Sequence, residues 1–231
     1  MSDTPTTALV TGGTGGLGTA VVELLLGRGH RVVVPWIKPS ELERLPPRTG
    51  LELVEADLFD PAAVARVIEV AAGDAGAPLR AVANLVGGFA MGQRVADTPV
   101  EDFEAQLALN LRPTYLVTQA AFPHLVAAGG GAIVCVSSRA ALRPFAGAPG
   151  YCAAKAAVAT FAAVVAEEGK ADGVRCNAIL PSVIDTPANR EAMGQDAEMV
   201  DPADIARVIV FLLGEESAPT SGAAVPVYGK A

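Results

Sequence analysis

A run of glycines between residues 12 and 18 most constrains how this 231-residue chain can fold. The short apolar segment 7–11 precedes the run, and residues 19–27 after it have helix-forming composition. Glycines between a strand and a helix let the backbone approach a ligand closely, and the helix N-terminus presents N–H groups to phosphate. The order of strand, glycine loop and helix therefore predicts a dinucleotide-binding unit. The glycines fit three registers, G-x-G-x-x-G from Gly13 and both T-G-x-x-G-x-x-G and T-G-x-x-x-G-x-G from Thr11, so they do not choose a subfamily.

Apolar runs of strand length alternate with helix-forming segments along the rest of the chain. We expect further strands at residues 31–35, 51–56, 80–86, 131–137, 174–180 and 223–228. Further helices are expected at residues 40–45, 61–72, 99–128 with local breaks at Pro113 and Pro123, 151–168, and 202–213. This alternation predicts an α/β fold in one domain over residues 1–231. The expected sheet is doubly wound, Rossmann-like and parallel, with about seven strands and helices on both faces.

Composition and charge exclude several other classes of protein. Hydrophobic residues make up 51 % of the chain and charged residues 18 %, which argues against disorder. The net charge of −8, without a block of basic residues, argues against nucleic-acid binding. No metal site is expected, because the two histidines and the three cysteines lack the spacing typical of metal ligands. The cysteines are Cys135, Cys152 and Cys176. We expect a soluble, cytoplasmic protein that does not enter membranes, since no signal peptide or uncharged span is evident.

The segment from Ser137 to Lys155 carries the residues best suited to chemistry. Ser137 and Ser138 end an expected strand, and Tyr151 opens a helix in which Lys155 lies one turn later on the same face. A free tyrosine has a pKa of about 10, and a neighbouring ammonium group favours its ionised form. A serine hydroxyl can hydrogen-bond a substrate oxygen, and one of the two serines is expected to do so because successive strand residues face opposite sides. The set predicts proton transfer to or from a carbonyl or alcohol oxygen.

Taken together, these motifs resemble the short-chain dehydrogenase/reductase family over nearly the whole chain. The T-G-x-x-x-G-x-G loop from Thr11 is similar to that family's cofactor loop, and Tyr151-x-x-x-Lys155 with Ser138 and Asn110 is similar to its catalytic tetrad. The resemblance implies that Tyr151 is the general acid in reduction and the general base in oxidation. It implies that Lys155 lowers the pKa of Tyr151 and binds the nicotinamide ribose. Ser138 would hold the substrate oxygen, and Asn110 would help to fix a water that relays protons.

The resemblance also implies a nicotinamide dinucleotide cofactor, NAD(P)(H). Cofactor contacts are expected from Gly12, Thr14, Gly16, Leu17, Gly18, Trp36, Lys38, Asp57, Leu58, Asn84, Gly87, Tyr151, Lys155, Pro181, Ile184 and Thr186. The position after the second strand carries Trp36 or Ile37 and then Lys38, so it lacks the acidic residue that binds the ribose 2′-hydroxyl of NAD. NADP(H) is therefore slightly favoured over NAD(H), although a lone lysine is also common on a solvated surface.

We expect the substrate site to be built from residues 87–95, 138–151 and 182–200. Residues 185–200, which form the lid in the family, are few, so an exposed or shallow site is expected. An apolar lining is expected from Phe89, Met91, Phe145 and Ile184. Two arginines in the loop after the serine either favour an acidic substrate or are solvated: Arg139 and Arg143.

The expected function is hydride transfer between the nicotinamide and a ketone or secondary alcohol, with a small molecule as the substrate. A narrower alternative is a 3-oxoacyl carrier-protein reductase. An alternative of another class is a non-catalytic dinucleotide-binding regulator, against which the complete set of Ser138, Asn110, Tyr151 and Lys155 speaks. A homodimer or homotetramer is expected, formed through the helix that begins at Tyr151 and the C-terminal strand, as the family often does.

Overall fold

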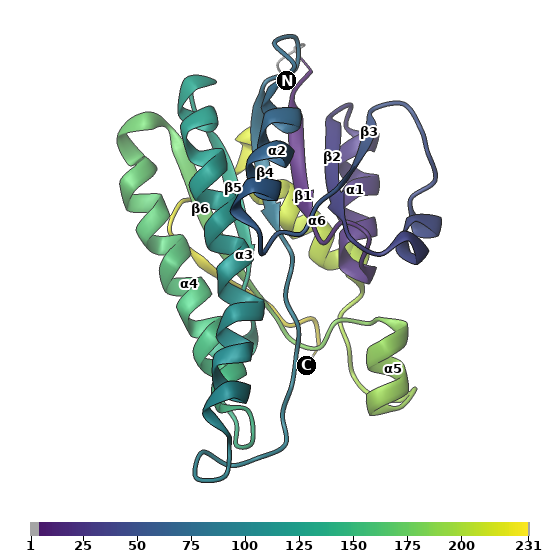
Figure 1. The fold of residues 1–231 in the computed structure, drawn as a ribbon, viewed down its shortest axis with the longest axis vertical. Helices are drawn as coiled ribbons and strands as arrows, with labels where there is room; N and C mark the ends of the chain where they lie inside the picture. The colour runs from purple at the N-terminus through teal and green to yellow at the C-terminus, as the bar shows by residue number, and fades with distance from the viewer. Residues whose placement is uncertain (1–4, 231) are drawn as a thin grey trace.

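A seven-stranded parallel sheet forms the centre of the protein (Figure 1). The computed structural model describes residues 5–230. The sheet order is β3-β2-β1-β4-β5-β6-β7, and every neighbouring pair of strands is parallel. The strands are β1 Thr7–Thr11, β2 Arg31–Trp36, β3 Leu51–Glu55, β4 Leu79–Asn84, β5 Gly131–Val136, β6 Val174–Pro181 and β7 Ala224–Val227. The predicted fold class is confirmed, and the strand order reverses between β1 and β4, where such sheets open a crevice for ligands.

Six α-helices cover the described part of the sheet and its carboxyl edge. They are α1 Gly16–Gly27, α2 Pro61–Ala72, α3 Val100–Ala127, α4 Pro149–Gly169, α5 Pro187–Met193 and α6 Pro202–Leu213. The core has two layers: α2, α3 and α4 pack on one face of the sheet, and α1 and α6 pack on the other. Four 3₁₀ turns complete the described residues: η1 Pro39–Arg44, η2 Arg139–Ala141, η3 Lys170–Asp172 and η4 Glu215–Ser217.

Two features of the helices differ from the sequence prediction. The helix α3 runs without a break through Pro113 and Pro123, so the predicted local breaks are wrong. Each proline removes a backbone hydrogen bond, but the packing of α3 against α4 and α2 holds the helix together. The short helix α5 was not predicted; it stands beyond the carboxyl ends of the strands in Figure 1.

The helix α4 has an apolar sequence and also buries a charged side chain, Lys155. The segment Pro149–Asp172 is long and apolar enough to cross a membrane by length and composition alone. Its inner face is instead buried against α3 and β6, with Ala154, Val158 and Ala162 in the core. The same face buries Lys155, so this helix has the features of a core helix of a globular domain.

Candidate active site

A cavity of about 1070 Å³ opens at the carboxyl ends of β4, β5 and β6. All three predicted substrate segments contribute to its wall, including Phe89 and Met91 from the first. The helix α5 and the loop after it form one side through Asn189, Met193 and Glu198. Residues 185–200 thus fold into a helix-containing wall on one side of the cavity, and whether the site is shallow stays a prediction.

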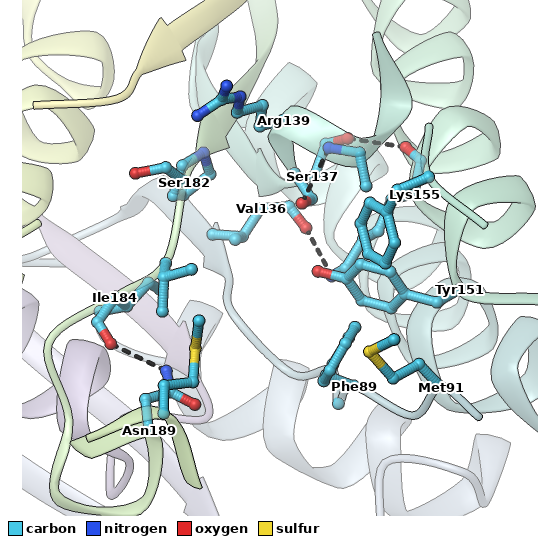
Figure 2. Close-up of a pocket in the computed structure, with 18 of the residues that line it drawn as sticks. Phe89, Met91, Val136, Ser137, Arg139, Tyr151, Lys155, Ser182, Ile184 and Asn189 are labelled. Atoms are coloured by element: carbon cyan, nitrogen blue, oxygen red, sulfur yellow. Dashed lines mark hydrogen bonds between the residues drawn. The ribbon is translucent and has the colours of Figure 1, made fainter. Parts of the chain in front are cut away.

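Tyr151 lies in the first turn of α4 and reaches the cavity. The ring of Phe89 meets the Tyr151 ring edge-on, with centroids 4.9 Å apart (Figure 2). The ring centroid of Phe145 lies 6.4 Å from that of Phe89. Burial raises the pKa of Tyr151 above its usual value of 10, and the hydroxyl of Ser138 acts in the opposite direction. The phenol therefore keeps its proton at neutral pH, as a donor to a substrate oxygen must.

Lys155 lies one turn further along α4, beneath Tyr151. Its Nζ donates a hydrogen bond of 3.1 Å to the carbonyl oxygen of Val136 and lies 5.9 Å from the centre of the Tyr151 ring. Burial lowers the pKa of Lys155 from 10.5 to about 8. The net pKa of Tyr151 is nevertheless raised, because desolvation of the phenol is the largest influence on it; the effect of Lys155 on this pKa stays a prediction.

The two adjacent serines have different environments. Ser137 is buried, and its hydroxyl donates a hydrogen bond of 2.7 Å to the backbone carbonyl of Lys155. This bond ties the end of β5 to α4. The Ser138 hydroxyl accepts a hydrogen bond of 3.2 Å from the backbone N–H of Ala140 and keeps its own proton for a ligand. Of the two serines, Ser138 is therefore the one whose hydroxyl remains available to a ligand.

Asn110 lies buried in α3, next to the loop that follows β4. Its Oδ1 accepts a hydrogen bond of 3.1 Å from Gly88 N–H, and its Nδ2 donates one of 3.0 Å to the Gln106 carbonyl. A Cβ atom on Gly87 would lie 2.7 Å from Asn110 Oδ1 and 3.0 Å from Lys155 Nζ. A side chain there would displace one or both of these groups, so the glycine lets Asn110 and Lys155 lie close together. The structure thus brings all four predicted catalytic residues to one region.

The glycine loop is held in a conformation that exposes the N-terminus of α1. Gly12 has a φ of +65°, and a Cβ on Gly18 would lie 2.1 Å from the Gly12 carbonyl oxygen. The N-cap residue is Gly15, with no side-chain cap and no acidic residue in the first turn of α1. Uncapped N–H groups at the positive end of a helix dipole suit a pyrophosphate group. The residues present therefore fit a dinucleotide, and Thr186 reaches over the loop, 2.9 Å from where a Cβ of Gly16 would be.

The comparisons with known proteins identify the family. Residues 6–197 match the family model described as short chain dehydrogenase. The chain belongs to the short-chain dehydrogenase/reductase family.

Relatives of this short-chain dehydrogenase/reductase align with nearly its whole chain. It is 31 % identical to 2-(R)-hydroxypropyl-CoM dehydrogenase of Xanthobacter autotrophicus, with 96 % of both chains covered. It is also 31 % identical to (3R)-3-hydroxyacyl-CoA dehydrogenase of Rattus norvegicus, with 96 % of this chain and 94 % of that protein covered. A solved short chain dehydrogenase/reductase family protein has a TM-score of 0.88 at 30 % identity, with 99 % of this chain and 98 % of that chain covered. The fold is also shared with ElxO with NADP bound, at a TM-score of 0.90, 23 % identity and coverage of 97 % and 98 %.

These relationships establish the general activity. The protein is a nicotinamide dinucleotide-dependent oxidoreductase that acts on CH–OH and carbonyl groups. The cofactor supplies or accepts the hydride, and the residues around the cavity bind and orient the reactants. Within residues 5–230 no cluster of three or more His, Cys, Asp or Glu side chains could hold a metal ion.

The residues predicted to contact the adenosine part of the cofactor lie at the ends of β2 and β3. Trp36 ends β2, and the exposed Lys38 precedes η1. The exposed Asp57 accepts a hydrogen bond of 2.9 Å from Phe59 N–H, and its neighbour Leu58 is buried. The predicted residues thus border the glycine loop on the side away from Tyr151.

Two residues of η1 that were not predicted from the sequence contact the glycine loop. Glu41 accepts a hydrogen bond of 2.7 Å from the hydroxyl of Thr14, and Arg44 donates one of 3.1 Å to the Thr14 carbonyl. Leu17, another predicted contact, is buried under the loop. The sequence signal that could have found these contacts is the charged pattern of the short helix directly after Lys38.

Asn84 is the predicted cofactor residue that the structure places elsewhere. Its side chain is buried on the α3 side of the sheet, where Nδ2 donates a hydrogen bond of 2.9 Å to the Thr118 hydroxyl. Its backbone neighbour Leu85 donates to Thr11 Oγ1 at 3.1 Å, which joins the ends of β4 and β1. The Asn84 side chain therefore points into the core, and no cofactor contact from it is visible in this arrangement.

The segment after β6 borders the cavity and the glycine loop. Pro181 ends β6, and both Pro181 and Ile184 line the cavity. Asn189 Nδ2 donates a hydrogen bond of 2.8 Å to the Ile184 carbonyl, and the Thr186 hydroxyl caps α5 by accepting from Asn189 N–H at 3.2 Å. The predicted nicotinamide-side residues therefore form one connected segment.

Proposed function

We propose that this enzyme interconverts a ketone and a secondary alcohol with Tyr151 as the general acid and base. The observation that carries the proposal is the convergence of Tyr151, Ser138 and Lys155 on one wall of the cavity. In reduction, the Tyr151 hydroxyl donates its proton to the carbonyl oxygen as the hydride reaches the carbonyl carbon. In oxidation, the phenolate takes the alcohol proton. The assignment is tested by comparing ketone reduction by the wild-type protein with reduction by Tyr151→Phe.

The other three residues support this proton transfer. The Ser138 hydroxyl donates a hydrogen bond to the substrate oxygen and stabilises the negative charge that develops on it. The Lys155 ammonium, held by the Val136 carbonyl, stabilises negative charge on the Tyr151 oxygen after it has given up its proton. Asn110, next to Lys155 across Gly87, positions a water through which Tyr151 regains its proton.

We also propose that the cofactor is NADP(H). The end of β2 lacks an acidic side chain, and the exposed Lys38 has no ion-pair partner within residues 5–230. Arg44 adds a second cation beside the glycine loop. The acidic Glu41 lies between Lys38 and Arg44 in the sequence. A 2′-phosphate would interact favourably with these cations.

The Lys38→Ala variant tests this cofactor preference. Removing one phosphate contact is expected to weaken NADPH binding about tenfold, the effect of one charge-assisted hydrogen bond, and to leave NADH binding within about twofold. Fluorescence titration of both cofactors against the wild type and the variant measures the change. A wild-type preference for NADH that the substitution does not alter would assign ribose recognition to Trp36 and the backbone.

The narrower alternative of a 3-oxoacyl carrier-protein reductase has one supporting feature, the two arginines in the cavity wall. A carrier protein would require a basic surface around the entrance, and the chain has only 17 Lys and Arg residues against 25 Asp and Glu. A free small molecule is therefore the substrate we favour. A cytoplasmic location fits the buried free thiols Cys135 and Cys176.

A homodimer or homotetramer is proposed from the outer face of α3 and α4. The rings of Tyr115 and Phe161 lie 5.8 Å apart across these helices, and Tyr115 and Val164 are 46 % and 48 % exposed. Burial of this face between subunits would remove apolar surface from water. Sedimentation velocity is expected to show a dimer or tetramer, shifted towards the monomer in Val164→Glu; a monomeric wild-type protein would contradict the proposal.

A further inference from the structure

The charged side chains that line the cavity are mostly cationic, in a protein of net charge −8. They are Arg139, Arg143, Lys155 and Glu198. Lys155 belongs to the catalytic group, and Glu198 lies on the opposite wall, in the loop between α5 and α6. The two arginines belong to η2 and the loop after it. An acidic chain thus presents a cationic patch beside its reactive groups.

Arg139 differs from the other half-buried arginines of the described chain in having no hydrogen-bond acceptor for its guanidinium. Five arginines of the described chain are half-buried, and four of them donate hydrogen bonds to carbonyl or carboxylate oxygens: Arg31, Arg80, Arg175 and Arg190. Within residues 5–230 the Arg139 side chain has no hydrogen-bond acceptor and no ion-pair partner. The N–H donors of Arg139 face the cavity with no acceptor from the described chain, so an anionic ligand group could accept hydrogen bonds from them.

The surroundings of Arg139 fix the guanidinium without using its donors. Its Cζ lies 5.4 Å from the centre of the Tyr228 ring, a cation–π contact. The Ser182 hydroxyl donates a hydrogen bond of 3.1 Å to the Tyr228 carbonyl, which ties the ends of β6 and β7 together beneath this contact. A stacked guanidinium keeps its N–H groups free to bind a carboxylate, sulfonate or phosphate in a bidentate manner.

The cavity therefore has two chemically different ends. Figure 2 shows Arg139 and Ser182 at one end, and Phe89 and Met91 at the other, with Ser137 and Val136 between them. The aromatic end continues from Phe89 to Phe145. A substrate that fills both ends must combine an apolar part with an anionic group.

We propose that Arg139 binds an anionic group of the substrate, and that the exposed Arg143 adds positive charge at the rim. This inference rests on the proposed function. The substrate class is then a ketone or secondary alcohol that carries a carboxylate, sulfonate or phosphate. The carbonyl lies at Tyr151 and Ser138, the anion at Arg139.

Matched pairs of oxo-carboxylic acids and their methyl esters, of several chain lengths, test this proposal. The wild-type protein is expected to reduce at least one acid with a kcat/KM about 10- to 100-fold above that of its ester, the range that hydrogen bonds to charged groups give. The ratio of kcat/KM for the acid to that for its ester is expected to fall at least about tenfold in Arg139→Gln. It should fall less in Arg139→Lys, which keeps the charge but not the bidentate geometry of the guanidinium. The control is Arg66→Gln, an exposed arginine of α2, which should keep the wild-type ratio.

Three other results would have distinct meanings. Equal rates for acids and esters across the series would overturn the proposal. A fall in both rates with an unchanged ratio in Arg139→Gln would show that Arg139 only supports Tyr228, and would also overturn it. If cofactor binds but no compound is reduced, the proposed function fails; calorimetric titration of the acids then decides on Arg139, since tighter binding to the wild type than to Arg139→Gln supports the anion site and equal binding rejects it.

Discussion

Tyr151→Phe is expected to lower kcat for ketone reduction by a factor of about 10² to 10⁴, the contribution typical of a positioned general acid. The substitution removes only the hydroxyl, so the ring keeps its edge-on contact with Phe89. The fold and the glycine loop should be unaffected, and the dissociation constant of the cofactor should stay within about twofold. Steady-state kinetics with a ketone that the wild type reduces measures kcat, and fluorescence titration measures the dissociation constant of the cofactor.

Tyr115→Phe is the matched control for this prediction. Tyr115 is an exposed phenol on α3, 46 % accessible, and its loss should leave kcat within about twofold of the wild type. A Tyr151→Phe variant with more than half of the wild-type kcat would remove Tyr151 from the proton transfer. Ser138 would then be the remaining hydroxyl in position to donate.

Lys155→Met is expected to abolish activity and to raise the free energy of unfolding at pH 7. Burial lowers the pKa of Lys155 from 10.5 to about 8, which corresponds to a cost of about 3 kcal/mol for charging this side chain in the folded protein. Methionine has a similar length and no charge, but the hydrogen bond to Val136 is lost, at about 1 kcal/mol. A net stabilisation of about 2 kcal/mol should therefore accompany the loss of activity.

The pH dependence of stability separates this effect from simple repacking. Between about pH 8 and 10.5 the unfolded chain binds a proton at Lys155 that the folded protein does not, so the stability of the wild type rises with pH in this window. Lys155→Met should lack this rise, and its advantage should shrink as the pH approaches 10.5. Urea denaturation at pH 7, 9 and 10 measures the difference. Lys170→Met, at an exposed position, is the control; parallel pH profiles for the wild type and Lys155→Met would contradict the prediction.

The sequence predicted most accurately those elements whose ends carry local signals. The bounds of α2 and α6 were predicted to the residue, because each helix has an aspartate N-cap, a proline at its start and a glycine after its end. The sheet followed from the alternation of strands and helices. The helix α5 escaped prediction because seven residues are too few to show helical periodicity. The breaks predicted at Pro113 and Pro123 do not occur in α3, because tertiary packing overrides local propensity in a long helix.

The candidate site was predictable in its members but not in its electrostatics. The resemblance supplied Asn110, Ser138, Tyr151 and Lys155, and the structure brings them together. The direction of the pKa shift of Tyr151 was not predictable, since it depends on how completely the surrounding chain removes the phenol from water. The lack of an acceptor for Arg139 within residues 5–230 could not be recognised either, because the sequence does not show which arginines find acceptors.

The placement of Tyr151 and Lys155 on consecutive turns of one long helix has a consequence for the evolution of this enzyme. The residues proposed to transfer the proton belong to a helix that packs against the sheet and α3, so their spacing is fixed by helix geometry. The facing wall, α5 with the loop that follows it, contains no buried residue between 187 and 199. Mutations can therefore remodel what the enzyme accepts without disturbing how it moves protons, and new substrates become accessible by changes confined to one short, tolerant segment.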